Sequence, residues 1–137
     1  MATSAQLGER GSTPKWKTWT GRILSAIPVL ALLMAAAMSF QHGPQVVEGM
    51  AKFGYPDGLI NVVAVLATVS ALLYAMPRTA VVGALFMTAY FGAAVATHLR
   101  VGDPGYPLAI IMATFTWGGL WLRDARVREL LPVRRTA

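Results

Sequence analysis

The chain contains no cysteine and has few charged residues. With no Cys among its 137 residues, it cannot form a disulfide framework, a thiol redox pair or a Cys-ligated metal site. Charged residues make up 13% of the chain, whereas a soluble domain averages about 25%. Hydrophobic residues make up 55%, and the length allows at most one domain. This composition is typical of a membrane protein.

The sequence also lacks the motifs of several enzyme classes. It has no Gly-rich phosphate loop and no nucleophile motif. Its two histidines, His42 and His98, could form a two-His carboxylate site with Glu48 or Asp103, but their spacing is not typical of metal ligands. We therefore predict no metal site, no bound cofactor and no catalytic activity of the chain on its own.

Four nearly charge-free apolar runs dominate the chain. At ~1.5 Å per residue, each of the first three is about 27 Å long, close to the ~30 Å hydrocarbon core of a bilayer. The runs lack the polar outer faces that a soluble helical bundle needs. The sequence therefore predicts an all-α fold, a transmembrane four-helix bundle. The four helices are expected at about residues 22–40, 59–76, 80–98 and 106–122.

Basic residues lie mainly on one side of these predicted helices. Of the 12 Lys and Arg residues, only Lys52 and Arg100 fall in the loops 41–58 and 98–107. The others precede the first run, separate the second from the third, or follow the fourth. Because positive residues stay on the cytoplasmic side, we predict that both termini are cytoplasmic. This placement accounts for the net charge of +6 without a nucleic-acid partner.

The chain divides into a membrane domain, residues 20–123, and two tails. Residues 1–19 are expected to be a disordered basic tail carrying the interfacial residues Trp16 and Trp19, and residues 124–137 a basic cytoplasmic tail. The first run resembles a signal peptide. It exceeds the usual ~7–15-residue apolar segment and three more runs follow, so we expect it to be retained. The short connection 76–79 predicts that the second and third helices are antiparallel neighbours.

The third predicted helix carries two distinctive faces. One is a stripe of small residues suited to close helix packing, formed by Ala84, Thr88, Gly92 and Ala96. The adjoining face spans about 100° of arc at 100° per residue, and its polar members lie toward the outer end. This face consists of Gly83, Met87, Tyr90, Ala94, Thr97 and His98.

These polar residues form the candidate ligand site. We expect a site at the outer surface formed by Tyr90, Thr97, His98 and Arg100, with His42, Glu48 and Asp103 as outer-face partners. Arg100 would hold an anionic group or a quinone oxygen, while His98 would exchange a proton or donate a hydrogen bond. Alternatively, Arg100 reaches lipid phosphates and His98 caps the last carbonyls of the helix.

Several segments in order resemble one family. They are Gly54-Tyr55-Pro56, Leu73–Ala80, Gly83-Ala84, Tyr90–Arg100 and Trp121–Asp124. Over about residues 20–132 the chain is similar to the DoxX-like family, which implies a four-helix bundle in a bacterial inner membrane. The broader group is linked to quinone-coupled sulfur oxidation, oxidative-stress complexes and assembly of membrane proteins. Relatives often carry a Lys and a Glu within the first two helices, where this chain has Ser39 and Ala67. Their absence removes the best candidate for an intramembrane ion pair.

Together these observations predict a multi-pass accessory protein of the bacterial inner membrane. It would present an outer-face pocket to another membrane or periplasmic protein, or to a small lipophilic ligand such as a quinone. One alternative is a membrane component of a quinone-linked redox system. A small transporter is a third, weakened by the lack of acids and bases inside the predicted helices. The sequence leaves the oligomeric state open.

Overall fold

The computed structural model describes residues 13–131, which form helices and no strand. The predicted all-α fold is therefore confirmed for this part of the chain. The helices are α2 (Lys15–Phe40), α3 (Pro44–Lys52), α4 (Leu59–Ala75), α5 (Ala80–Arg100), α6 (Tyr106–Arg123) and α7 (Ala125–Leu130).

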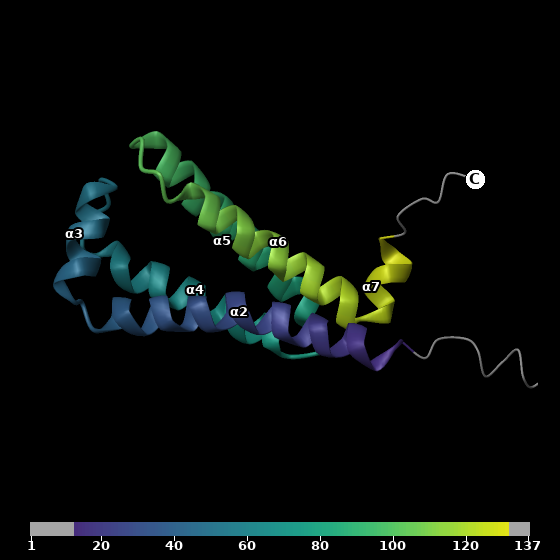
Figure 1. Ribbon diagram of the computed structural model, residues 1–137. Helices are drawn as coiled ribbons and strands as arrows, with labels where there is room; N and C mark the ends of the chain where they lie inside the picture. The colour runs from purple at the N-terminus through teal and green to yellow at the C-terminus, as the bar shows by residue number, and fades with distance from the viewer. Residues whose placement is uncertain (1–12, 132–137) are drawn as a thin grey trace, which may run out of the picture.

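The four long helices pack in a ring. Helix α2 contacts α4 and α6, and α5 contacts the same two helices. The connection 76–79 joins α4 to α5, so the prediction that these two helices are neighbours is confirmed. In Figure 1 the pair α2–α4 and the pair α5–α6 meet near α7 and diverge toward α3. We call the end near α7, where the described chain begins and ends, the terminal end, and the end near α3 the loop end.

Two helices, α2 and α5, are long and apolar enough to cross a membrane, and α4 is a shorter apolar helix. Helix α2 begins at Lys15, so residues 15–19 are helical, which corrects the predicted disordered tail at these positions. Pro14 stands at the N-cap and no further proline follows it before Pro28, which allows the helix to begin early. The rest of that predicted tail, residues 1–12, lies outside the described part.

The predicted cytoplasmic tail also contains a helix. Residues Ala125–Leu130 form α7, because the Asp124 side chain accepts a hydrogen bond from the backbone amide of Arg126 at 3.0 Å and caps the new helix. Val127 of α7 is buried against the other helices. Residues 132–137, the remainder of this predicted tail, lie outside the described part.

Tyr74 joins three helices at the centre of the terminal half. Its side chain is 0% exposed, and its hydroxyl donates to the Thr116 carbonyl of α6 at 2.6 Å. The Ser25 hydroxyl of α2 lies 2.9 Å from the same oxygen. Since the phenol has one proton and gives it to Thr116, Ser25 is the donor in this second bond. A buried hydroxyl requires such partners, so Tyr74 fixes how α2, α4 and α6 meet.

Glycine residues bring the backbones together around Tyr74. A Cβ on Gly83 of α5 would lie 2.1 Å from the Tyr74 amide nitrogen. On α2, a Cβ on Gly21 would lie 2.8 Å from the Arg123 amide nitrogen, and one on Gly119 of α6 would lie 2.5 Å from the Ser25 hydroxyl. Such close approach is available only to residues without a side chain.

The packing face of α5 differs from the predicted small-residue stripe. Ala84 is buried, but Thr88, Gly92 and Ala96 of that stripe are exposed. The buried residues of α5 are instead Ala80, Gly83, Ala84, Met87 and Phe91. The prediction was wrong because α5 meets the α4 backbone through Gly83, which turns most of the stripe away from the core.

The glycine contacts give a matched pair of variants on α5. We expect Gly83→Ala to destabilise the fold by about 1–3 kcal/mol, because its methyl group would overlap the rigid Tyr74 backbone. Gly92→Ala meets nothing within 4 Å and should be neutral or stabilising by up to about 1 kcal/mol, since Ala favours helix more than Gly does. Thermal unfolding in detergent measures both variants. Equal stability of the two variants would contradict this packing.

Candidate functional site

Two loops close the loop end of the molecule. One connects α3 to α4 and the other connects α5 to α6. Each turns at a glycine with positive φ, Gly54 at 75° and Gly102 at 68°, a conformation that glycine adopts without a steric cost. The Tyr55 amide donates to the Met50 carbonyl at 2.9 Å, and the Asp103 amide donates to the His98 carbonyl at 2.9 Å. These bonds end α3 and α5 in well-defined turns.

Side chains of the two loops meet in a cluster that we call the outer clasp. Its members are Lys52, Phe53, Tyr55, Thr97, His98, Arg100 and Asp103. Asp103 is the centre of its charged part, because its carboxylate accepts from the Lys52 ammonium and from His98 Nδ1 at 2.6 Å. The Gly105 amide donates to the same carboxylate at 2.9 Å.

These three donors favour the ionised form of Asp103. Hydrogen bonds from Lys52, from the Gly105 amide and from His98 hold the pKa of the Asp103 carboxyl far below its ordinary value of 3.8, against a small opposing effect of desolvation. The carboxylate also fixes the orientation of His98. With Nδ1 donating to Asp103, a neutral His98 presents Nε2 as an acceptor.

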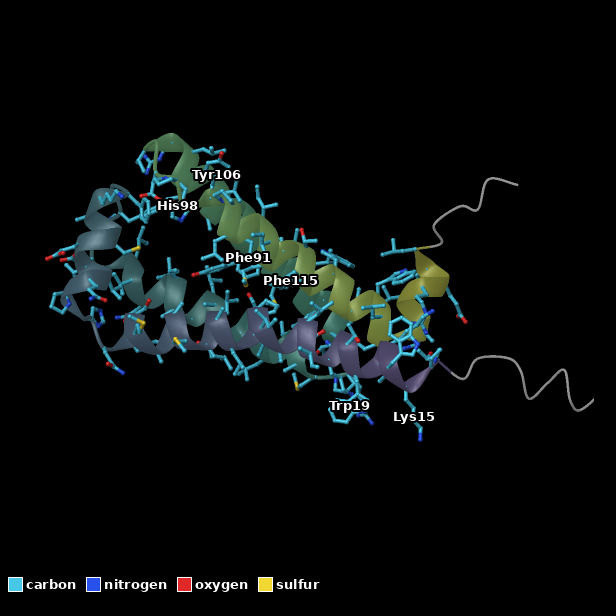
Figure 2. All side chains as sticks on the ribbon, viewed as in Figure 1. Lys15, Trp19, Phe91, His98, Tyr106 and Phe115 are labelled. Carbon is cyan, nitrogen blue, oxygen red and sulfur yellow. The ribbon has the colours of Figure 1, made fainter. Side chains whose placement is uncertain are left out.

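Apolar and aromatic contacts form the rest of the outer clasp. The His98 ring packs edge-on against Phe53, with 4.9 Å between ring centroids, and Figure 2 shows His98 on the side of α5 that faces α3. Tyr55 and Thr97 share a hydrogen bond of 2.8 Å between their hydroxyls. The Arg100 guanidinium donates to the Phe53 carbonyl and lies over the Tyr55 ring at 5.9 Å.

The structure brings together part of the predicted site. Thr97, His98 and Arg100 meet in the outer clasp with Asp103. Tyr90 lies apart from them, because seven residues of helix separate it from Thr97 by about 10 Å. It packs against the buried core and contacts the Phe91 ring edge-on at 5.9 Å.

Two predicted partners lie outside the outer clasp. His42 is exposed in the turn after α2, where its Nδ1 lies 3.1 Å from the Phe40 carbonyl, and Glu48 is exposed on α3. Within residues 13–131, no group of three or more His, Asp or Glu side chains is placed to hold a metal ion. The alternative two-His carboxylate site therefore has no counterpart in the described structure.

Sequence reasoning missed three members of the outer clasp: Lys52, Phe53 and Tyr55. Two signals could have indicated them. Gly54-Tyr55-Pro56 is one of the segments that carry the family resemblance, and the predicted topology places both loops on the same side of the membrane. Neither signal gives the register of one loop against the other, so the pairing appears only in the structure.

The described structure also has a hollow between α5 and α6, which we call the α5–α6 hollow. Its volume is about 590 Å³, and its lining includes Thr88, Phe91, Gly92, Ala109, Ala113 and Trp117. A smaller hollow of about 300 Å³ lies at the turn between α2 and α3. Neither hollow is lined by Tyr90, Thr97, His98 or Arg100.

Residues 23–119 match the sequence profile of the DoxX-like family. The chain belongs to the DoxX-like family. This match confirms the resemblance seen in the sequence, and with the apolar helices it identifies a membrane protein. The matched residues include those of the outer clasp, and also Ser25, Tyr74 and Thr116. No curated protein and no solved structure matches the chain.

The charged part of the outer clasp predicts a pH dependence of stability. Because folding lowers the pKa of Asp103, the ionised carboxylate stabilises this DoxX-like protein above the ordinary pKa of 3.8. That contribution is lost as the pH falls through the lower folded-state pKa. At pH 7 we expect Asp103→Asn to melt a few degrees below wild type, and we expect the difference to shrink below about pH 4.

Thermal unfolding between pH 7 and pH 3 measures this effect. Asp57→Asn is the matched control, because Asp57 is an exposed carboxylate at the same end of the molecule. It should melt like wild type throughout this range. A difference between wild type and Asp103→Asn that stays constant down to pH 3 would contradict the role given to the carboxylate.

Proposed function

We propose that this DoxX-like protein crosses a bacterial inner membrane four times and acts there as a non-catalytic accessory subunit. Helices α2, α4, α5 and α6 would be the spans, with both termini on the cytoplasmic side. The alternating direction of these helices and their apolar outer surfaces support this topology. Exposed aliphatic side chains lie on each of these helices, for example Leu30, Val65, Leu85 and Ile110.

The distribution of charge supports the same orientation. Near the terminal end, the described residues include seven basic and two acidic side chains. They are Lys15, Lys17, Arg22, Arg78, Arg123, Arg126 and Arg128, with Asp124 and Glu129. The loop end has two basic and three acidic side chains, Lys52 and Arg100 with Glu48, Asp57 and Asp103. An excess of positive charge on one side favours the cytoplasm for that side.

The outer clasp is the observation that carries the accessory role. It holds two loops from different helix pairs in one arrangement and leaves polar groups at the surface, including a Lys52 side chain that is 60% exposed. A surface ordered before binding loses less conformational entropy when a partner docks. We therefore propose that another membrane or periplasmic protein recognises this face, with His98 and Arg100 near its centre.

A quinone-linked redox role has weaker support. The α5–α6 hollow has the size and aromatic walls of a small-molecule site, but its polar side chains already donate to partners within the protein. Thr88 accepts from Trp117 Nε1 at 2.7 Å and donates to the Ala84 carbonyl at 2.7 Å. A quinone oxygen would find no free donor there. The hollow therefore suits an apolar chain better than a quinone ring.

The absence of cysteine allows a direct test of the topology. Single substitutions Glu48→Cys and Asp57→Cys should react with a membrane-impermeant maleimide in intact spheroplasts, because both positions lie in outer loops. Glu129→Cys, an exposed position at the terminal end, should react only after the membrane is permeabilised. The reverse labelling pattern would exclude the proposed orientation, and labelling of all three before permeabilisation would exclude four spans.

The accessory role predicts a partner that depends on the outer clasp. Native purification with mass spectrometry should identify a co-eluting protein, and its yield should fall about tenfold or more in Arg100→Ala and in His98→Ala, as expected for central contact residues. Arg78→Ala removes an exposed arginine at the opposite end and serves as the control. A solitary protein that carries a chromophore or alters quinone turnover would instead favour the redox role.

A further inference from the structure

Helix α2 is longer than a membrane span. Its 26 residues extend about 39 Å, whereas the hydrocarbon core is ~30 Å thick. The face of α2 that packs against α6 begins at Gly21 and Ser25, which are buried. Residues 15–20, a little under two turns, therefore precede this packed face at the terminal end.

The exposed side of these turns carries aromatic and apolar residues together. Trp16 is 63% exposed, Trp19 is 62% exposed, and Ile23, one turn further on, is 60% exposed. Figure 2 shows Trp19 and Lys15 extending from the same side of α2, away from the other helices. The two indoles are therefore not part of the core. They lie at the end of a predicted span, where Trp side chains are enriched at the membrane interface.

Each of these indoles has a cation beside it. Lys17 Nζ lies 5.6 Å from the centre of the Trp16 ring, and the Arg22 guanidinium lies 5.7 Å from the Trp19 ring. Within residues 13–131 the acids of the terminal end are Asp124, which pairs with Arg126 at 3.3 Å, and Glu129 on α7. Among the described residues, no acidic side chain forms an ion pair with Lys15, Lys17 or Arg22.

We propose that the first two turns of α2, through Lys15, Trp16, Lys17, Trp19 and Arg22, bind the headgroups of anionic phospholipids. Here the cations would pair with phosphate groups and the indoles would lie between headgroups and acyl chains. This inference rests on the membrane topology proposed above. It does not depend on the accessory role or on a partner at the outer clasp.

The apolar face below these residues favours lipid over an acidic soluble protein. Below Ile23 the exposed side of α2 continues with Ile27, Leu30 and Met34, so one surface passes from basic and aromatic to fully apolar along the helix. A lipid monolayer has this same order of headgroup and acyl chain. A soluble acidic partner would match only the first two turns.

The test measures which lipids the purified full-length protein retains. The protein is placed in nanodiscs with equal amounts of phosphatidylglycerol and phosphatidylcholine, extracted gently, and examined by native mass spectrometry. We expect phosphatidylglycerol to be retained preferentially. The triple variant Lys15→Gln, Lys17→Gln, Arg22→Gln should lower the ratio of retained phosphatidylglycerol to phosphatidylcholine about tenfold or more, since each cation near an anionic surface contributes to binding.

A charge-conserving variant separates charge from folding. Lys15→Arg, Lys17→Arg, Arg22→Lys keeps every cation and should retain the wild-type lipid preference. The variant Arg78→Gln removes an exposed cation from the connection between α4 and α5 and should leave most of the preference in place. If the neutral triple variant fails to fold, the amounts of the two lipids retained by wild type still test the proposal. Equal retention of phosphatidylglycerol and phosphatidylcholine by wild type would overturn it.

A site for a free anion would give a different result from a site for a lipid headgroup. Inorganic phosphate added to lipid-free detergent micelles should not raise the melting temperature, whereas phosphatidylglycerol should. Stabilisation by inorganic phosphate alone would show a free-anion site and overturn the lipid assignment. A wild-type protein that shows the lipid preference but co-purifies with no partner protein would contradict only the accessory role. Recovery of the protein in the aqueous fraction without detergent would contradict both proposals.

Discussion

The hydroxyl of Tyr74 is the interaction on which the rest of the structure depends. An apolar interior gives a buried phenol no water, so its oxygen must find protein partners, and it finds them on two other helices through Ser25 and Thr116. Arg123 adds to the same centre, because its guanidinium donates to the Tyr74 carbonyl at 3.0 Å and lies 4.8 Å from the Tyr74 ring. Gly83 then lets α5 approach the Tyr74 backbone. Together these contacts set the positions of all four long helices at the terminal end.

The two ends of the molecule are held in different ways. At the terminal end the backbones touch through glycine, which leaves little freedom to move. At the loop end the helix pairs have diverged (Figure 1), and polar side chains of the outer clasp connect them instead. Hydrogen bonds and ion pairs near water contribute less to stability than close packing in the core. The loop end of this DoxX-like protein therefore depends on the outer clasp for its arrangement, whereas backbone packing fixes the terminal end.

How much of the structure could be predicted differs between the helices and the site. The apolar runs placed three helices at 59–76, 80–98 and 106–122, within two residues of the observed α4, α5 and α6, because the lengths of these helices follow directly from hydrophobicity. The start of α2 was missed because Lys and Trp residues suggested a tail although they also form helix. In the outer clasp, His98 and Asp103 are five residues apart and could be associated by reading along the chain. Lys52 lies 51 residues from Asp103, and local spacing holds no information about that contact.

The sequence by itself determined the helical class, the family and the side of the molecule on which charge accumulates, since each depends only on composition and order along the chain. Tertiary structure alone decided which face of each helix is buried. The predicted stripe of α5 and the observed packing face lie next to each other on the same helix, and both contain small residues. The choice between them depends on where Gly83 meets Tyr74. Tertiary structure also brought Phe53 to His98 and Tyr55 to Thr97, because contacts between loops of different helix pairs depend on how those pairs pack.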